Sequence, residues 1–158
     1  MQKYHLNNNY FKKEIVFFLL LYTSLLISFV IGENSTGGAI IDYESTKSIS
    51  QQFASDFIGT LLNYDDFSSR HSPILIFFLT FFEQINLPDQ LIRIVHLHIC
   101  LILPIIFYKI LVLKFGLKYR NYHIVLVGLI FLSPTFRTSS IWPDSRLLGL
   151  VIFSISIL

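Results

Sequence analysis

The chain has 158 residues, of which 53% are hydrophobic and 14% charged, against about 25% charged residues in ordinary soluble domains. A soluble domain of this length cannot bury so much apolar surface in one core, so the composition indicates a membrane protein. The net charge of +2, without a basic cluster, argues against a nucleic-acid partner. Cys100 is the only cysteine, which excludes an internal disulfide and a cysteine metal cage.

The first apolar run, Ile15–Gly32, carries no charge and has about the 20 residues that a bilayer requires. Lys3, Lys12 and Lys13 precede it. A cleaved signal peptide is the rival interpretation, because small residues near the end of the run resemble a cleavage site. The run exceeds the usual signal-peptide core of about 7–15 residues, so we expect a retained anchor. Residues 1–14 are then a cytoplasmic tail.

Three further apolar runs follow in the second half of the chain. Leu91–Leu113 is long enough to cross a bilayer, and Pro104 within it predicts a kink. Tyr122–Phe136 is the next run, and the last begins at Arg146 and is still apolar where the sequence ends. Together the runs predict an all-α, polytopic fold with about four transmembrane helices.

The last run is shorter than a bilayer requires. We therefore expect residues 1–158 to be the N-terminal portion of one longer transmembrane module, truncated in the gene or in the chain itself.

Charge bias predicts the topology. Lys114, Lys118 and Arg120 lie together in a connection without acids, and the positive-inside rule places this connection and the N-terminus in the cytoplasm. That placement requires two crossings between them, which the first run and Leu91–Leu113 supply. The apolar run within residues 73–87 is too short to cross, so we expect a juxtamembrane helix that lies at the interface.

Residues 33–90 are then an outer loop that contains this interfacial helix. The turn Arg137–Asp144 faces the same side. The loop from 33 to 72 holds six of the ten acids: Glu33, Asp42, Glu44, Asp56, Asp65 and Asp66. Acids and polar groups thus converge on one face of the membrane.

The long run Leu91–Leu113 also contains ionisable residues. His96 and His98 are two positions apart and point to different helix faces, so they are poor joint metal ligands. We expect neighbouring helices to satisfy both. Arg93, near the start of the run, is expected to extend to the interface. No Gly-rich phosphate loop, H-E-x-x-H or G-x-S-x-G motif is present.

The order of motifs carries a resemblance. An early outer acid, Asp42, follows the first span. Then come "RHSPILIFFL", the span "LIRIVHLHICLILPIIFYKIL" and the connection "LSPTFRTSSIWPDSRLLG". These resemble the H-P-P-L-x-x-x-L, A-L-R-L and S-P-x-F … D-x-x-L motifs of the GT-C superfamily of membrane glycosyltransferases. That superfamily includes the protein O-mannosyltransferases and the bacterial aminoarabinose and RgtA-like transferases. The resemblance covers residues 10–158.

The chain also departs from the family pattern. Tyr43 separates Asp42 and Glu44, where the family often has adjacent Asp and Glu. His-Ser-Pro replaces His-Pro-Pro. Arg70 stands where some members carry an acid used with a metal, so participation of a divalent metal stays open, and no metal-ligand set is assigned.

The resemblance implies inverting transfer of a hexosyl or pentosyl group from a polyprenyl-phosphate donor to a glycan, lipid or protein acceptor. An acceptor hydroxyl needs a carboxylate base, and the departing phosphate needs cationic partners. Asp42 is the expected catalytic base, with Glu44 as its backup. Arg70 and His71, at a helix start, are expected to bind the donor phosphate. Asp144 is either an acid of the same cavity or an N-cap of the following helix.

The implied localisation is multi-pass in a membrane, such as the bacterial inner membrane, with the active face outward. This portion alone is expected to be inactive, because the family's cavity uses later spans. The alternatives are a non-enzymatic membrane protein, such as a transporter fragment or assembly subunit, and a lipid-linked polysaccharide polymerase or ligase. Transporters tend to bury ionisable groups near the bilayer midplane, whereas nearly all acids here lie outside the predicted spans.

The topology can be tested by cysteine labelling after Cys100 is replaced by Ser. With Lys118→Cys, an impermeant maleimide added from outside should not react, whereas with Ser48→Cys it should. Reaction at position 118 from outside would contradict the assignment and would make the run within residues 73–87 a crossing.

Overall fold

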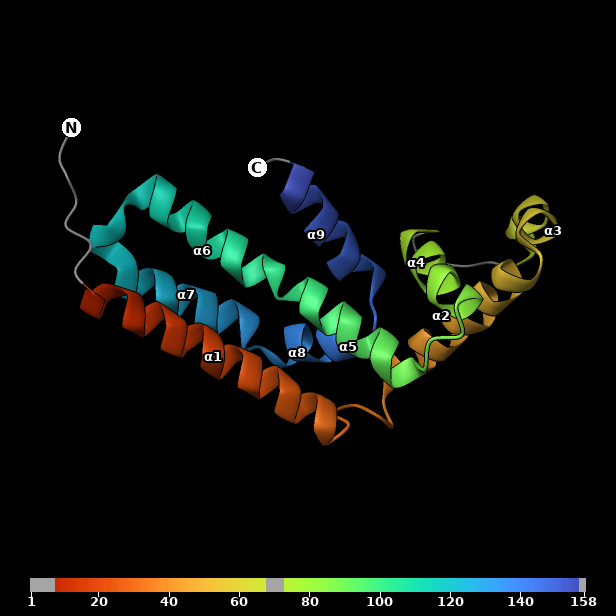
Figure 1. The fold of residues 1–158 in the computed structure, drawn as a ribbon, viewed down its shortest axis with the longest axis horizontal. Helices are drawn as coiled ribbons and strands as arrows, with labels where there is room; N and C mark the ends of the chain where they lie inside the picture. Colours follow the sequence, from red (N-terminus) through yellow and green to blue (C-terminus); the bar gives the residue numbers. More distant parts are fainter. Residues whose placement is uncertain (1–7, 68–72, 157–158) are drawn as a thin grey trace.

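The computed structural model describes residues 8–67 and 73–156, and within these ranges every regular element is a helix and no strand is present (Figure 1). The predicted all-α class is therefore confirmed. The α-helices are α1 (Asn8–Val30), α2 (Gly38–Ser55), α3 (Phe57–Leu62), α4 (Pro73–Gln84), α5 (Asp89–Cys100), α6 (Ile102–Phe115), α7 (Arg120–Phe131), α8 (Pro134–Ile141) and α9 (Ser145–Ser156). Two 3₁₀ turns are η1 (Tyr64–Phe67) and η2 (Leu117–Tyr119).

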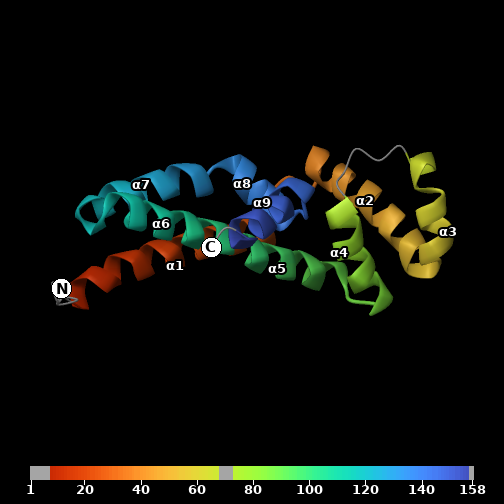
Figure 2. The same cartoon turned by 90° about the horizontal axis from the view of Figure 1, so that it is seen from above.

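Helices α1, α5–α6 and α7 lie lengthwise beside one another and form an elongated bundle (Figures 1 and 2). The start of α1 and the α6–α7 connection lie at the same end, which we call the basic end. There Glu14 accepts a hydrogen bond from the Tyr108 hydroxyl at 2.8 Å and pairs with Arg120 at 3.4 Å. At the opposite end α1 meets the α8–α9 turn, and we call this the cavity end.

Among the described residues, two helical stretches are long and apolar enough to cross a membrane: Lys12–Val30, and Asp89–Phe115, which comprises α5 and α6. Both coincide with runs that the sequence predicts to cross. The stretch Leu117–Phe131 together with Pro134–Ile141 is a third candidate if the bent pair counts as one span. The long pair is interrupted at Leu101, because the ring nitrogen of Pro104 has no hydrogen with which to bond the carbonyl one turn earlier.

The apolar run Tyr122–Phe136 does not form one straight helix. Helix α7 ends at Phe131, and the helices on either side of the break meet at 62°. The cause is local, because the Ser133 hydroxyl accepts from the Phe136 N–H at 3.3 Å and Pro134 occupies the first helical position. Ser followed by Pro is a strong helix start, so the chain begins a new helix here.

The segment expected as an outer loop is helical over much of its described part, because the chain forms α2 and α3 there. Helix α1 ends at Val30, and the φ of 66° at Gly32 lets the Glu33 N–H reach back to the Ser28 carbonyl at 2.9 Å. Helix α2 then leaves in a different direction from α1 and packs along α4 (Figure 1).

Helix α4 occupies most of the helix predicted over residues 73–87. It ends at Gln84, and Asn86, with a φ of 54°, allows the Leu87 N–H to bond the Phe82 carbonyl at 3.0 Å. This left-handed cap stops the helix slightly earlier than predicted.

Helix α1 packs through one narrow stripe. Leu21 and Leu25 are fully buried, whereas Leu20 is 64% exposed and Ile15 is also exposed. The remaining faces of the helix are therefore apolar and open, which suits contact with lipid.

This difference predicts unequal costs for two substitutions on one helix. Leu25→Ala should destabilise the fold by about 2 kcal/mol, because the substitution leaves a gap and loses packing contacts. This cost is lower than in many soluble cores, since the lipid around an unpacked helix is as apolar as leucine. Leu20→Ala is the matched control and should change stability by less than about 0.5 kcal/mol. Unfolding in detergent micelles measures both, and equal costs would contradict the assigned faces.

Candidate functional site

An open cavity of about 430 Å³ lies at the cavity end of the bundle, between the first half of α2, helix α8 and the turn that leads into α9. Its lining combines carboxylates, hydroxyls, an amide, an indole and a guanidinium. Concave sites with a few convergent polar groups are typical of small-molecule binding. The polar lining residues are Asn34, Asp42, Thr46, Thr135, Thr138, Ser139, Trp142, Asp144 and Arg146.

Asp42 lies in this cavity, but on a helix and not on the predicted loop. Gly38 and Thr46, one turn to either side of Asp42 on α2, line the same space, as expected for residues spaced by four. The Thr46 hydroxyl donates to the Asp42 carbonyl at 2.8 Å, so Thr46 is satisfied within its own helix. The Asp42 side chain is exposed toward the cavity.

The structure describes one of the other predicted catalytic and phosphate-binding residues. Glu44 is exposed on α2, two positions after Asp42 and on a different face, and it is not among the described residues that line the cavity. The structure therefore separates the two acids that the sequence analysis treated as interchangeable. Arg70 and His71 lie outside the described residues.

Asp144 caps the start of α9 and also lines this cavity. Its Oδ1 accepts from the Arg146 backbone N–H at 2.7 Å, which is the geometry of an N-cap, and its side chain also lines the cavity. The Arg146 guanidinium pairs with Oδ2 at 2.6 Å. Burial alone would raise the pKa of the Asp144 carboxyl. The hydrogen bonds and the positive charge of Arg146 outweigh burial and hold that pKa below its ordinary value, so Asp144 is an anion at neutral pH.

His96 holds the turn that carries Asp144. Its ring is fully buried, with Nδ1 2.9 Å from the Ser140 carbonyl and Nε2 3.4 Å from the Asp144 N–H. A carbonyl only accepts and an N–H only donates, so the ring is a neutral imidazole protonated on Nδ1. His98 instead contacts Tyr22 at 3.0 Å. The expectation that neighbouring helices satisfy the two histidines on different faces is confirmed.

Trp142 is fixed from two sides. Its indole N–H donates to the Glu33 carbonyl at 2.9 Å, and the Arg93 guanidinium lies 3.6 Å from the centre of its ring. Arg93 also donates to the Ile141 carbonyl at 2.9 Å. Arg93 therefore packs against the end of α8.

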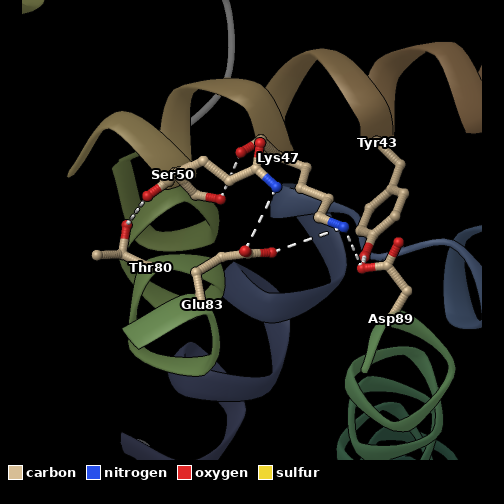
Figure 3. Close-up of polar contacts among 7 residues, drawn as sticks. Tyr43, Lys47, Ser50, Thr80, Glu83 and Asp89 are labelled. Atoms are coloured by element: carbon tan, nitrogen blue, oxygen red, sulfur yellow. Dashed lines mark hydrogen bonds and ion pairs between the residues drawn. The ribbon is translucent and has the colours of Figure 1, made fainter. Parts of the chain in front are cut away.

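A polar cluster lies on the face of α2 that looks toward α4 and α5 (Figure 3). The Lys47 ammonium bonds Asp89 at 2.5 Å and lies 3.7 Å from Glu83. The buried Tyr43 hydroxyl donates to the same carboxylate of Asp89 at 3.2 Å. Burial, followed by the nearby charge of Asp89, raises the pKa of Tyr43, so its hydroxyl remains a donor. The cluster connects three helices and sets the rotation of α2 that turns Asp42 to the cavity.

The described residues contain no group of three or more His, Cys, Asp or Glu side chains placed to hold a metal ion. The Asp144 carboxylate of the cavity is paired with Arg146, which makes it a poor ligand for a cation.

Comparison with protein-family models, with curated proteins and with solved structures gives no match to this chain.

Three residues that position or line the site were missed in the sequence. Arg146 and Trp142 lie beside Asp144 in "IWPDSRLL", so their proximity to that acid was a usable signal. Lys47 had no such signal, because its partner Asp89 is 42 positions away in the chain.

The cluster predicts a local effect of Lys47→Met. Lys47 and Asp89 are both partly exposed, so the substitution should lower the local stability by about 1 kcal/mol. This is less than the loss of a buried hydrogen bond to a charged group. Amide hydrogen exchange in the middle of α2 should then be about fivefold faster, since 1.4 kcal/mol corresponds to about tenfold.

Gln52→Met, at an exposed position on the same helix, is the matched control and should leave exchange unchanged. Equal exchange in both variants would mean that Lys47 does not hold α2.

Proposed function

We propose that this chain belongs to a membrane glycosyltransferase similar to the GT-C superfamily, which transfers a sugar from a polyprenyl-phosphate donor. The observation that carries the proposal is the position of Asp42 and Asp144. They are the two acids that the family resemblance selects, they are far apart in sequence, and they line one cavity.

The chemistry of the lining fits a sugar. Sugars present many hydroxyls that both donate and accept hydrogen bonds. The cavity offers two carboxylates as acceptors, and Thr135, Thr138 and Ser139 as groups that do both.

In the proposed reaction the oxygen of an acceptor hydroxyl attacks the anomeric carbon and inverts it. A bond from that oxygen to carbon forms, and the bond from carbon to the phosphate oxygen breaks. Asp42 takes the hydroxyl proton as general base, and polyprenyl phosphate leaves as an anion.

The departing phosphate needs a cationic partner. Arg146 supplies a guanidinium that lines the cavity and is 80% exposed despite its contact with Asp144. An exposed ion pair of this kind is weak in water, so a phosphate can compete for the guanidinium. Arg70 and His71 remain proposed phosphate ligands on the strength of the resemblance.

The proposed placement has the basic end in the cytoplasm and the cavity end at the outer surface. In this placement helices α1 and α5–α6 cross the bilayer, and α4 lies along the interface. Further crossings bring the total to the predicted four. Supporting this placement, the basic cluster around Lys114 and the cavity lie at opposite ends of the bundle. A donor with a lipid tail would then reach the cavity from the membrane.

The test is sugar transfer from polyprenyl-phosphate donors by the full-length protein in membranes. Asp42→Asn keeps the size of the side chain but cannot accept a proton at neutral pH. It should lower the rate by about 10²–10⁴-fold while expression and insertion stay unchanged.

Glu44→Gln is the matched control, because Glu44 lies on the same helix outside the cavity, and it should keep nearly full activity. Activity in Asp42→Asn with loss in Glu44→Gln would move the base to Glu44. Full activity in both variants would remove the acids from the mechanism.

A further inference from the structure

Helix α3 presents apolar side chains to its surroundings. Ile58 is 64% exposed and Leu62 80% exposed, and Phe57 and Leu61 are exposed as well. Only Thr60 on this short helix is buried. Exposure of such a surface to water is unfavourable, and contiguous exposed apolar area of this kind marks a contact site.

The apolar surface continues onto α4. Phe77 is exposed there, and its ring centre lies 5.9 Å from that of Phe57 on α3. Phe81, one turn further along α4, is 58% exposed. The two helices thus share one surface, which we call the α3–α4 apolar surface.

The opposite side of the same unit is mostly polar, although Ile41 of α2 is also exposed there. Helix α2 packs along α4, and its outward positions Glu44, Ser48 and Gln52 are exposed. The unit of α2, α3 and α4 is therefore amphipathic as a whole, with one polar and one apolar side. A single helix that lies in a membrane interface has the same division.

The unit also lies at the right place for such a contact. Figures 1 and 2 show α2, α3 and α4 grouped beside the cavity end, away from the basic end. If the two candidate spans cross a bilayer, this end lies near the boundary between headgroups and acyl chains.

We propose that the α3–α4 apolar surface inserts into that boundary, with α3 as a second membrane anchor beside α4. The inference rests on the membrane placement proposed above, not on sugar transfer. The occupant is the lipid bilayer, because the surface is continuous with a helix at the end of the spans and its reverse side is polar.

The neighbouring charges select the kind of lipid surface. Asp56 accepts from the Gly59 N–H at 2.9 Å, and Asp65 and Asp66 follow α3. Carboxylates on both sides of α3 disfavour an anionic surface. The surface therefore fits zwitterionic headgroups, and apolar burial supplies the attraction.

The test uses nitroxide spin labels on the full-length protein, with Cys100 replaced by Ser, in phosphatidylcholine nanodiscs. Single labels are placed through Ile58→Cys and Leu62→Cys, with Ser48→Cys on the polar side as the matched control. Labels at 58 and 62 should collide more with oxygen, which concentrates in the acyl region. The label at 48 should collide more with a water-soluble nickel complex.

Preferential collision with nickel at 58 and 62 would overturn the proposal, because α3 would then face water. Low collision with both reagents would also overturn it, because a protein surface would then cover α3. As a second measurement, Ile58→Glu should raise nickel collision at 62 at least several-fold, whereas Ser48→Glu should not. The Asp42→Asn variant should keep the labelling pattern, so a failure of the proposed transferase activity leaves this result interpretable.

Discussion

The cavity end is organised by Glu33, the residue directly after Gly32 in the turn that follows α1. Its carbonyl accepts from the Trp142 indole, and its carboxylate pairs with Arg137 at 2.9 Å. One residue therefore connects the end of the first long helix to α8 and to the turn after it. Arg93 of α5 stacks on Trp142 from the other side. These contacts add to those of α2 with α4 and α5 in holding together the segments that carry the two acids of the cavity.

The long helices were predictable because length and lack of charge are properties of a continuous run of residues. The spans Ile15–Gly32 and Leu91–Leu113 needed no knowledge of their neighbours. Helix α2 was missed because its buried stripe includes Thr46 and Ser50, which a hydropathy pattern counts as polar. Both hydroxyls donate to carbonyls of their own helix, at 2.8 Å and 2.7 Å, and so can be buried at little cost.

The site was predictable only in part for a related reason. The order of motifs selected Asp42 and Asp144, but their shared cavity depends on the bend at Ser133 and on the helical form of α2. Glu44 was a reasonable substitute for Asp42 while the segment was pictured as a loop. On a helix, side chains two positions apart point to nearly opposite faces, roughly 160° apart. Glu44 therefore does not line the cavity.

The bond between Trp142 and Glu33 joins residues 109 positions apart. During synthesis, therefore, the first long helix must wait for most of the chain before its end acquires a partner. Local helices form much earlier, since their contacts are close in sequence. The cavity is thus completed late in synthesis, and an interruption before Trp142 would leave the earlier helices without the α8–α9 turn that closes the site.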